Sequence, residues 1–218
     1  MRILITGGSG YIGTRVGKLL ADRDHSVRAL VRAESAPRLP SGVQPIIGNA
    51  LDSTSVAAAL AGGETLVHLV GTPHPNPAKA AEFERVDLAS IRASVSAAKE
   101  KALAHLVYVS VAHPAPAMHD YVAARVAGEA AIVDGGLTAT ILRPWYVLGP
   151  GHWWPVVLLP LYGVGELVPR TRAASRRLGL VTLAEMARAL VLAVESPPPS
   201  RTQRIVEVPE IRRARLER

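Results

Sequence analysis

The sequence predicts an α/β fold in which a doubly wound parallel sheet carries helices on both faces, followed by a small C-terminal lobe. Short apolar segments alternate with helical patterns along most of the chain, which is typical of such a sheet. A glycine-rich turn at residues 6–13 joins the first apolar segment to the first helical one, as at a Rossmann-like nucleotide site. The chain of 218 residues, 49% of them hydrophobic, is long enough to bury the core of one domain.

The strands are predicted by short apolar segments rich in β-branched residues. Gly48 and Gly71 close the third and the fourth of them. The expected strands are residues 3–5, 27–31, 43–47, 65–70, 103–109, 137–142 and 204–208.

The helices are predicted by apolar residues that recur with helical spacing. In the third helix, Leu88, Ile91 and Val95 share one face. Ser53 is expected to cap the second helix, and Gly135 with the glycine after it to end the fourth. The expected helices are residues 14–20, 53–60, 79–99, 120–133 and 182–194.

The pattern changes after Pro144. Residues 144–170 are rich in Pro, Gly and aromatic side chains and lack a clean period, so we expect loops there. We take residues 1–218 as a single domain in which 144–170 and 179–210 form a small lobe on the substrate side. The charged tail from Arg212 onward is expected to be frayed.

The charge favours a small anionic ligand over nucleic acid. The chain has 25 Lys and Arg against 18 Asp and Glu, a formal charge of +7. Such a balance helps to attract an anionic cofactor. The basic residues are dispersed except at 170–177 and 212–218, and no aromatics that could stack bases are interleaved with them. We therefore expect a small-molecule substrate and no nucleic-acid partner.

Several classes of protein are disfavoured by what the sequence lacks. There is no cysteine, so disulfides and thiolate metal sites are excluded, and the histidines lack a paired ligand spacing, so no metal is expected. No Gly-x-Ser-x-Gly elbow of a hydrolase is present. No apolar run reaches the roughly 18 residues of a membrane span. The first strand begins at Ile3 without a signal peptide before it, so we expect a cytoplasmic protein.

The glycine turn has the spacing of a dinucleotide-binding loop. Gly7 suits a tight turn, Gly10 allows close approach of phosphates, and Gly13 allows the helix to pack on the strand. The first amides of the helix then point at the anion. A plain strand-to-helix turn is the alternative interpretation.

Three further segments match one family together with this loop: Gly48-Asn49-Ala50, residues 67–71, and residues 142–151 with Arg143-Pro144 and Gly149-Pro150-Gly151. The chain resembles the extended and atypical branches of the short-chain dehydrogenase/reductase family, whose members include NAD-dependent epimerase/dehydratase-like and NmrA-like proteins. The resemblance covers nearly the whole chain and implies an NAD(P)-binding oxidoreductase. It implies cofactor contacts from Gly7, Ser9, Gly10, Tyr11, Ile12, Gly13, Arg32, Asn49, Ala50, Leu69, Val70, Gly71, Ser110, Tyr121, Arg125 and Pro144.

The end of the second strand favours NADP(H) over NAD(H). A carboxylate there would bond the ribose 2′-hydroxyl of NAD, whereas an arginine accommodates a 2′-phosphate. This chain has Arg32 at that position, and Arg38 is close enough to assist. Glu34 leaves NAD(H) open, and an arginine that merely faces solvent is the alternative reading of Arg32.

The catalytic groups that the resemblance implies are Tyr121, Arg125 and Ser110. In the family, a lysine four residues after the tyrosine lowers the pKa of the tyrosine hydroxyl and binds the nicotinamide ribose. Here Arg125 stands in place of that lysine, on the same helical face as Tyr121. Ser110 is a candidate for orienting the substrate, and His113 and His119 are nearby polar alternatives. The changed lysine position keeps a second hypothesis open, a non-catalytic NADP(H)-sensing regulator or scaffold.

Aromatic residues follow the sixth strand, where the resembling family borders its substrate. Trp145, Tyr146 and Trp153 are expected to bind substrate, and Trp154 lies beside them. Such walls suit a small carbonyl or quinone-like molecule, although the rings equally suit packing of the lobe. The chain is expected to be a monomer or a homodimer, since family members often pair through the helices predicted at 79–99 and 120–133.

Overall fold

A seven-stranded sheet forms the centre of the protein in a computed structural model, which describes residues 1–158, 160, 165 and 167–216, apart from the side chains of Trp154 and Leu158. All pairings are parallel, in the order β3-β2-β1-β4-β5-β6-β9. The predicted doubly wound α/β fold is confirmed. The strands are β1 (Arg2–Thr6), β2 (Ser26–Val31), β3 (Val43–Ile47), β4 (Thr65–His68), β5 (His105–Val109), β6 (Ala139–Arg143) and β9 (Gln203–Glu207).

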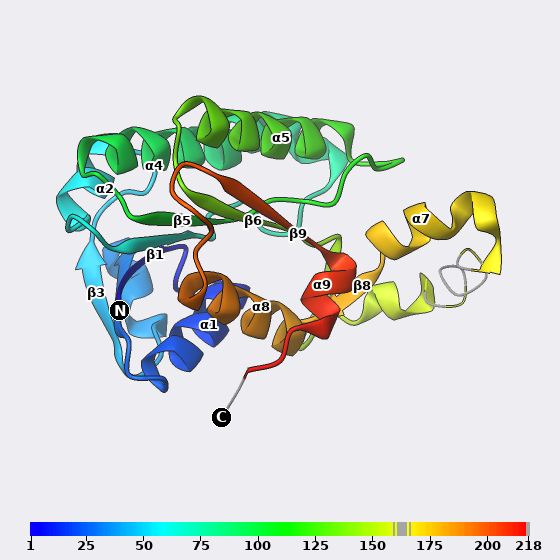
Figure 1. Cartoon of the computed structure of the whole chain (residues 1–218), viewed down its shortest axis with the longest axis horizontal. Coiled ribbons are helices and arrows are strands. Elements are labelled where there is room, and N and C mark those ends of the chain that lie inside the picture. Colours follow the sequence, from blue (N-terminus) through cyan, green and yellow to red (C-terminus); the bar gives the residue numbers. More distant parts are fainter. Residues whose placement is uncertain (159, 161–164, 166, 217–218) are drawn as a thin grey trace.

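Helices cover both faces of this sheet (Figure 1). One layer holds α1 (Tyr11–Ala21) and α8 (Leu183–Glu195), and the other holds α2 (Ser53–Ala59), α4 (Ala89–Glu100) and α5 (His119–Asp134). Side chains of β1 point alternately to the two layers: Ile3 and Ile5 pack against the first layer, and Leu4 packs against the second. Strands buried on both faces are continuously apolar, which is why the sequence pattern located them.

The strand order reverses direction at β1. The chain passes from β1 to β2 and β3 on one side, then returns to β4 on the other side of β1. A crevice forms at such a reversal beyond the carboxyl ends of the strands, because the two connecting segments leave in opposite directions. The glycine turn at residues 7–10 lies at this point, between β1 and α1.

The helix predicted at 79–99 is longer and contains an irregular turn. It comprises η2 (Pro77–Lys79), α3 (Ala80–Glu82), the π-helical turn η3 (Phe83–Leu88) and α4. The expected Ser53 cap of α2 is wrong. Asp52 is the N-cap, because its carboxylate accepts hydrogen bonds from the amides of Thr54 and Ser55. A 3₁₀ turn, η1 (Ala33–Arg38), follows β2 and was not predicted.

The C-terminal third contains more regular structure than the expected loops. β7 (Tyr146–Leu148) pairs with β8 (Leu180–Thr182) in a second, two-stranded sheet, and η4 (Trp154–Leu158) and α7 (Pro169–Arg177) lie between them. α8 packs against α1, and β9 extends the main sheet, so these parts of residues 179–210 belong to the body of the domain. The assignment of 144–170 and 179–210 to a substrate-side lobe stays a prediction.

The fraying expected from Arg212 onward is wrong for Arg212 and Arg213, which are helical; residues 214–216 follow without regular structure, and residues 217 and 218 lie outside the described part of the chain. α9 (Val208–Arg213) follows β9 directly, and its Glu207 and Glu210 form a capping box. Ile211 is fully buried in the core beside α8. The apolar residues of this segment are few and spaced one turn apart, which made them hard to distinguish among its charges.

Candidate functional site

A groove of three adjoining pockets crosses the carboxyl ends of the central strands. The first pocket, of about 390 Å³, lies between the glycine turn, the end of β2 and residues 48–51. The central pocket, of about 470 Å³, extends from the glycine turn to Tyr121 and Arg125. The aromatic pocket, also of about 470 Å³, continues past Tyr121 to Trp145 and Tyr146. Gly7 and Gly10 line the first two pockets, and Tyr121 lines the last two, so the three form one path.

Gly7 and Gly13 have no room for a side chain. Gly7 adopts a φ of +78°, and a Cβ there would lie 2.7 Å from the carbonyl carbon of Leu69. A Cβ at Gly13 would lie 2.3 Å from the carbonyl oxygen of Gly7. Gly10 caps α1 with extended backbone and no side-chain hydrogen bond, which leaves the positive end of the helix open to the groove. The residues present fit a dinucleotide pyrophosphate.

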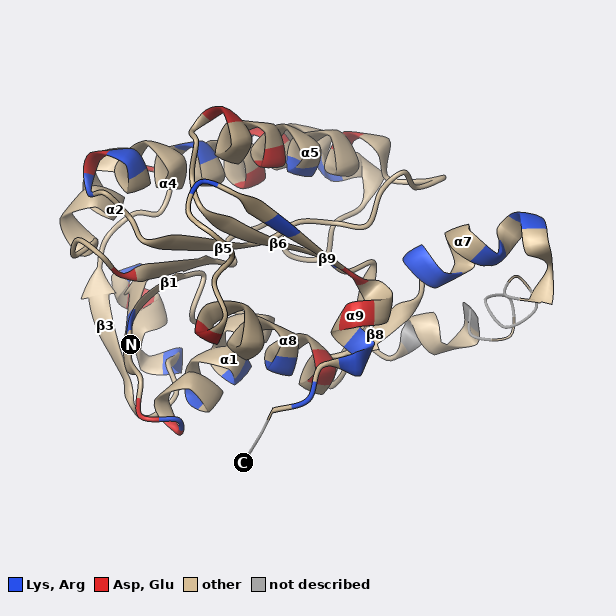
Figure 2. Cartoon of the chain, viewed as in Figure 1, with Lys and Arg blue, Asp and Glu red and all other residues tan. Residues whose placement is uncertain are grey.

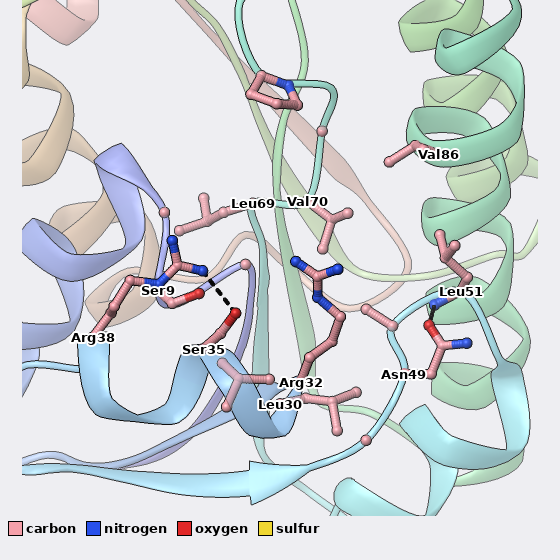
Figure 3. A pocket seen from close by; sticks show the side chains of 17 residues that line it. Ser9, Leu30, Arg32, Ser35, Arg38, Asn49, Leu51, Leu69, Val70 and Val86 are labelled. Carbon is pink, nitrogen blue, oxygen red and sulfur yellow. Dashed lines mark hydrogen bonds between the residues drawn. The ribbon is translucent and has the colours of Figure 1, made fainter. Parts of the chain in front are cut away.

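Two arginines line the first pocket, Arg32 at the N-cap of η1 and Arg38 at its last residue (Figure 3). Arg38 donates a hydrogen bond of 2.7 Å to the hydroxyl of Ser35, which is buried. Arg32 is 72% exposed and pairs through its Nε with Glu34 at 3.1 Å. Glu34 is not among the residues that line the pocket. The sequence argument did not find Ser35, whose role depends on the unpredicted 3₁₀ turn.

Apolar side chains line the rest of the first pocket. Leu30, Leu51, Val70 and Val86 surround it together with the backbone of Asn49 and Ala50 (Figure 3). The carbonyl oxygen of the Asn49 side chain accepts a hydrogen bond of 3.0 Å from the amide of Leu51, which fixes this turn. Leu51 is 42% exposed, an unusual position for a leucine at a loop tip.

Tyr121 and Arg125 meet at the junction of the central and aromatic pockets. The guanidinium carbon of Arg125 lies 5.3 Å from the Tyr121 ring centroid and 5.9 Å from that of Tyr108. Arg125 is only 6% exposed, and it donates a hydrogen bond of 2.9 Å to the carbonyl of Val109. Burial opposes its charge, but Tyr121, Tyr108 and Asp87 together raise its pKa above the ordinary value. The cation is therefore permanent.

Asp87 is a site residue that sequence reasoning missed. Its Oδ1 lies 2.6 Å from Nη2 of Arg125, and its Oδ2 accepts hydrogen bonds of 2.9 and 2.6 Å from the amide and hydroxyl of Thr72. The carboxylate is fully buried, so it ties the loop after β4 to η3 and α5. The signal was available: Asp87 precedes Ile91 by one turn on the apolar helix face, where a carboxylate requires a partner. Gly71 is small because a Cβ there would lie 2.1 Å from Arg125.

Ser110 lines the central pocket but its hydroxyl is engaged elsewhere. It donates a hydrogen bond of 2.5 Å to Oε1 of Glu129, a buried carboxylate on α5. Arg143 donates to the same carboxylate, with 3.0 Å between its Nε and Oε1, and Nε2 of His113 lies 3.4 Å from it. His113 thus faces Glu129, and neither it nor His119 lines any of the three pockets.

Two of the three residues predicted to bind substrate line the aromatic pocket. Trp145 and Tyr146 line it with ring centroids 5.4 Å apart, and burial raises the pKa of Tyr146. Trp153 lies outside the three pockets and is 56% exposed. The side chain of Trp154 is outside the described part of the chain.

A stack of rings that the sequence did not predict closes the aromatic pocket. The Tyr11 and His152 rings lie 4.3 Å apart, and the His152 and His74 rings stack at 5.1 Å with an angle of 4°. All three side chains line the pocket. Tyr11 comes from the first turn of α1, and His74 and His152 come from two separate loops, so their meeting depends on the fold.

The described residues offer no grouping of three or more His, Asp or Glu that could hold a metal ion. Over the same residues, every helix is too short or too polar to cross a membrane.

Comparison with known proteins supports a dinucleotide site in this groove. A sequence model described as NAD(P)H-binding matches residues 7–150. The chain is 29% identical over 171 residues to a 4-hydroxy-2-methyl-3-oxo-4-farnesyl-3,4-dihydroquinoline-1-oxide ketoreductase of Stigmatella aurantiaca, covering 68% of this chain and 51% of that protein. It is 25% identical over 213 residues to a ceramide reductase of Caulobacter vibrioides, covering 97% of this chain and 65% of that protein. The chain thus spans about half to two thirds of these relatives.

The fold has solved counterparts. A short-chain dehydrogenase/reductase superfamily protein of Agrobacterium tumefaciens with bound NAD superposes with a TM-score of 0.69 at 16% identity, over 95% of this chain and 77% of that one. Together, the sequence match and this superposition establish the family and the fold that the strand order and the glycine turn indicate. The chain belongs to the NAD(P)H-binding family and has the fold of the extended short-chain dehydrogenase/reductases.

Proposed function

We propose that the groove binds NADP(H) and that the protein is an oxidoreductase that reduces a carbonyl or quinone-like group on an apolar substrate. The observation that carries this proposal is the position of Tyr121. Its side chain lies over a permanent buried cation and lines both the central pocket and the aromatic pocket. A tyrosine at this junction can touch a molecule in either pocket.

The first and central pockets support the cofactor assignment. The open end of α1 suits the pyrophosphate, and the apolar walls around Leu51 suit an adenine ring. Arg38, held by Ser35, offers charge-assisted hydrogen bonds to a ribose 2′-phosphate, with Arg32 beside it. Glu34 pairs with Arg32 instead of lining the pocket, which favours NADP(H) over NAD(H).

Tyr121 is the proposed proton donor. When bound, the cofactor supplies or accepts a hydride. Tyr121 gives its hydroxyl proton to the substrate oxygen, and the positive charge of Arg125 stabilises the negative charge left on the tyrosine oxygen. Arg125 also holds Tyr121 in place through the stacking of its guanidinium on the ring. The hydroxyl proton of Ser110 is committed to Glu129, so Ser110 shapes the cofactor side of the groove.

The aromatic pocket and the relatives support the proposed substrate class. Its walls include Val111, Met118, Trp145 and Pro155. The names of the relatives describe reductases of a farnesyl-bearing quinoline derivative and of a ceramide, both of which carry long apolar chains. We propose that residues 144–170 lie on the substrate side, because Tyr146, Val147 and His152 line this pocket, and that β8 of residues 179–210 supports them by pairing with β7.

The test is NADPH oxidation with quinones and long-chain ketones as acceptors. Tyr121→Phe is expected to abolish turnover while the affinity for NADPH stays within about twofold, since only a proton donor is lost. Tyr11→Phe is the matched control, because it removes another hydroxyl from the same groove. Turnover retained by Tyr121→Phe at the level of Tyr11→Phe would remove Tyr121 from the mechanism.

A second candidate function is a non-catalytic NADP(H) sensor. The observation that favours it is the engagement of both terminal nitrogens of Arg125 with Asp87 and Val109, which leaves less freedom than a flexible lysine has. A sensor would bind NADPH with undiminished affinity but oxidise it with none of the acceptors. Turnover that depends on Tyr121 would exclude this candidate.

A further inference from the structure

A separate cavity lies where α8, β9 and α9 meet. Its volume is about 510 Å³, similar to the volumes of the pockets of the groove, and it shares no lining residue with them. β9 is the last strand of the main sheet, so the cavity lies at the sheet edge opposite β3. We call it the α8–β9 cleft. A molecule bound there would not compete with one in the groove.

The floor of the α8–β9 cleft is apolar. Leu192 of α8 and Val206 of β9 line it and are half-buried. Ala189, Ala193 and Ala214 also line it and are buried. Cavities that bind small molecules have mostly apolar walls with a few polar groups. This floor suits a hydrocarbon chain.

Arginines line the rest of the cleft. Arg204, Arg213 and Arg215 stand against one carboxylate, that of Glu210, among the described residues that line it. Figure 2 shows a blue segment on β9 and both blue and red segments on α9. Glu210 belongs to the cap of α9, where its Oε2 accepts a hydrogen bond of 3.1 Å from the amide of Glu207. The lining is therefore positively charged.

Two of these arginines lack partners. Among the described residues, the side chains of Arg204 and Arg213 form no hydrogen bond or salt bridge. Nε of Arg204 is buried, so this N–H has lost water without gaining an acceptor, which costs free energy. Arg215 donates only to the main-chain carbonyls of Arg212 and Ala214, which are neutral. An anion in the cleft would compensate all three positive charges.

We propose that the α8–β9 cleft binds an organic anion that carries a hydrocarbon chain, with a medium-chain carboxylate as the simplest case. A planar guanidinium gives a carboxylate two parallel hydrogen bonds, which are strengthened by charge. The chain of the ligand then covers the apolar floor. Inorganic phosphate would leave that floor uncovered. The proposal involves no residue of the groove, and it stands even if the chain catalyses no reaction.

The test is calorimetric titration of the full chain with octanoate. We expect saturable binding at one molecule per chain. Acetate, which lacks the hydrocarbon chain, should bind about 100-fold more weakly or less. 1-Octanol, which lacks the charge, should bind about tenfold more weakly or less.

Variants of the arginines test the charged part of the site. Arg204→Gln/Arg213→Gln should bind octanoate about tenfold more weakly or less. Arg213→Gln alone changes an exposed position, so the protein should stay folded, and it should lose about threefold or more. The matched control Arg92→Gln/Lys99→Gln removes two charges from exposed positions on α4 and should bind octanoate as wild type does.

A variant of the aromatic pocket tells the two apolar sites apart. Trp145→Ala opens that pocket and should leave the affinity for octanoate unchanged. No saturable binding of octanoate by wild type, an equal loss in the α4 control, or a loss in Trp145→Ala would overturn the proposal. So would a wild-type dimer in sedimentation velocity that Arg213→Glu dissociates, because a second copy of the chain would then cover the cleft.

Discussion

The buried pair of Arg125 and Asp87 gives the sharpest prediction about how the site is held together. Arg125→Met removes the cation while keeping a side chain of similar length. Asp87, which is fully buried, then keeps its charge with only the two hydrogen bonds from Thr72. Leaving one member of a buried ion pair without its partner costs about 3–5 kcal/mol. We expect the free energy of unfolding to fall by that amount.

The second substitution, Asp87→Asn, is expected to lower the free energy of unfolding of the wild type and to raise that of Arg125→Met. In the wild type it leaves the buried charge of Arg125 without its carboxylate partner and destabilises the protein, again by about 3–5 kcal/mol. In Arg125→Met it removes an unpaired buried charge, and the asparagine oxygen can still accept hydrogen bonds from Thr72. There it should restore most of the lost stability.

The assay is urea unfolding at neutral pH, followed by tryptophan fluorescence, for the four proteins of this double-mutant cycle. The midpoint of each single variant should fall by about 1–2 M urea, and that of the double variant by much less. If Asp87→Asn destabilised both backgrounds equally, the two residues would not be coupled. The account of a buried pair that holds the β4 loop against α5 would then be refuted.

Two further predictions concern the glycine turn and a buried histidine. Gly13→Ala should weaken NADPH binding at least tenfold, because its Cβ would lie 2.3 Å from the oxygen of Gly7, whereas Gly62→Ala meets only an atom 3.5 Å away and should have no effect. Burial, and secondarily Arg204, lower the pKa of His105 to about 4, while the unfolded chain takes up this proton near pH 6.5. Its contribution to stability is complete above pH 6.5 and falls by about 1.4 kcal/mol per pH unit down to about pH 4. His105→Gln should reduce the acid slope by that amount in urea unfolding, and an unchanged slope would contradict the assignment.

The fold was predictable because it depends on patterns that are local in the sequence. Each central strand is an apolar run, and α4 and α8 repeat their apolar residues about once per turn. Gly7 and Gly13 were also predictable, because only glycine fits where backbones come within about 3 Å. These features require no knowledge of the neighbours in space.

The interior of the site was not predictable for the opposite reason. Arg125 and Asp87 are brought together by the packing of α5 against η3, and nothing near either residue in the sequence indicates the other. The pairing of β7 with β8 joins segments more than thirty residues apart. Ser110 was predicted to be a candidate for orienting the substrate, but its hydrogen bond to Glu129 could not be predicted, because it forms only once α5 is in place.

The central claim, that the groove is an NADP(H) site, is tested most directly by calorimetric titration of NADPH and NADH. The wild type is expected to bind NADPH at least tenfold more tightly, since hydrogen bonds from arginine to a phosphate contribute about 1.5–3 kcal/mol. Arg38→Ala, and to a lesser degree Arg32→Ala, should remove this preference while the affinity for NADH stays nearly unchanged. Arg92→Ala, on the outer surface of α4, is the control and should leave it intact. Equal affinity of the wild type for the two cofactors, or no binding of either, would contradict the account.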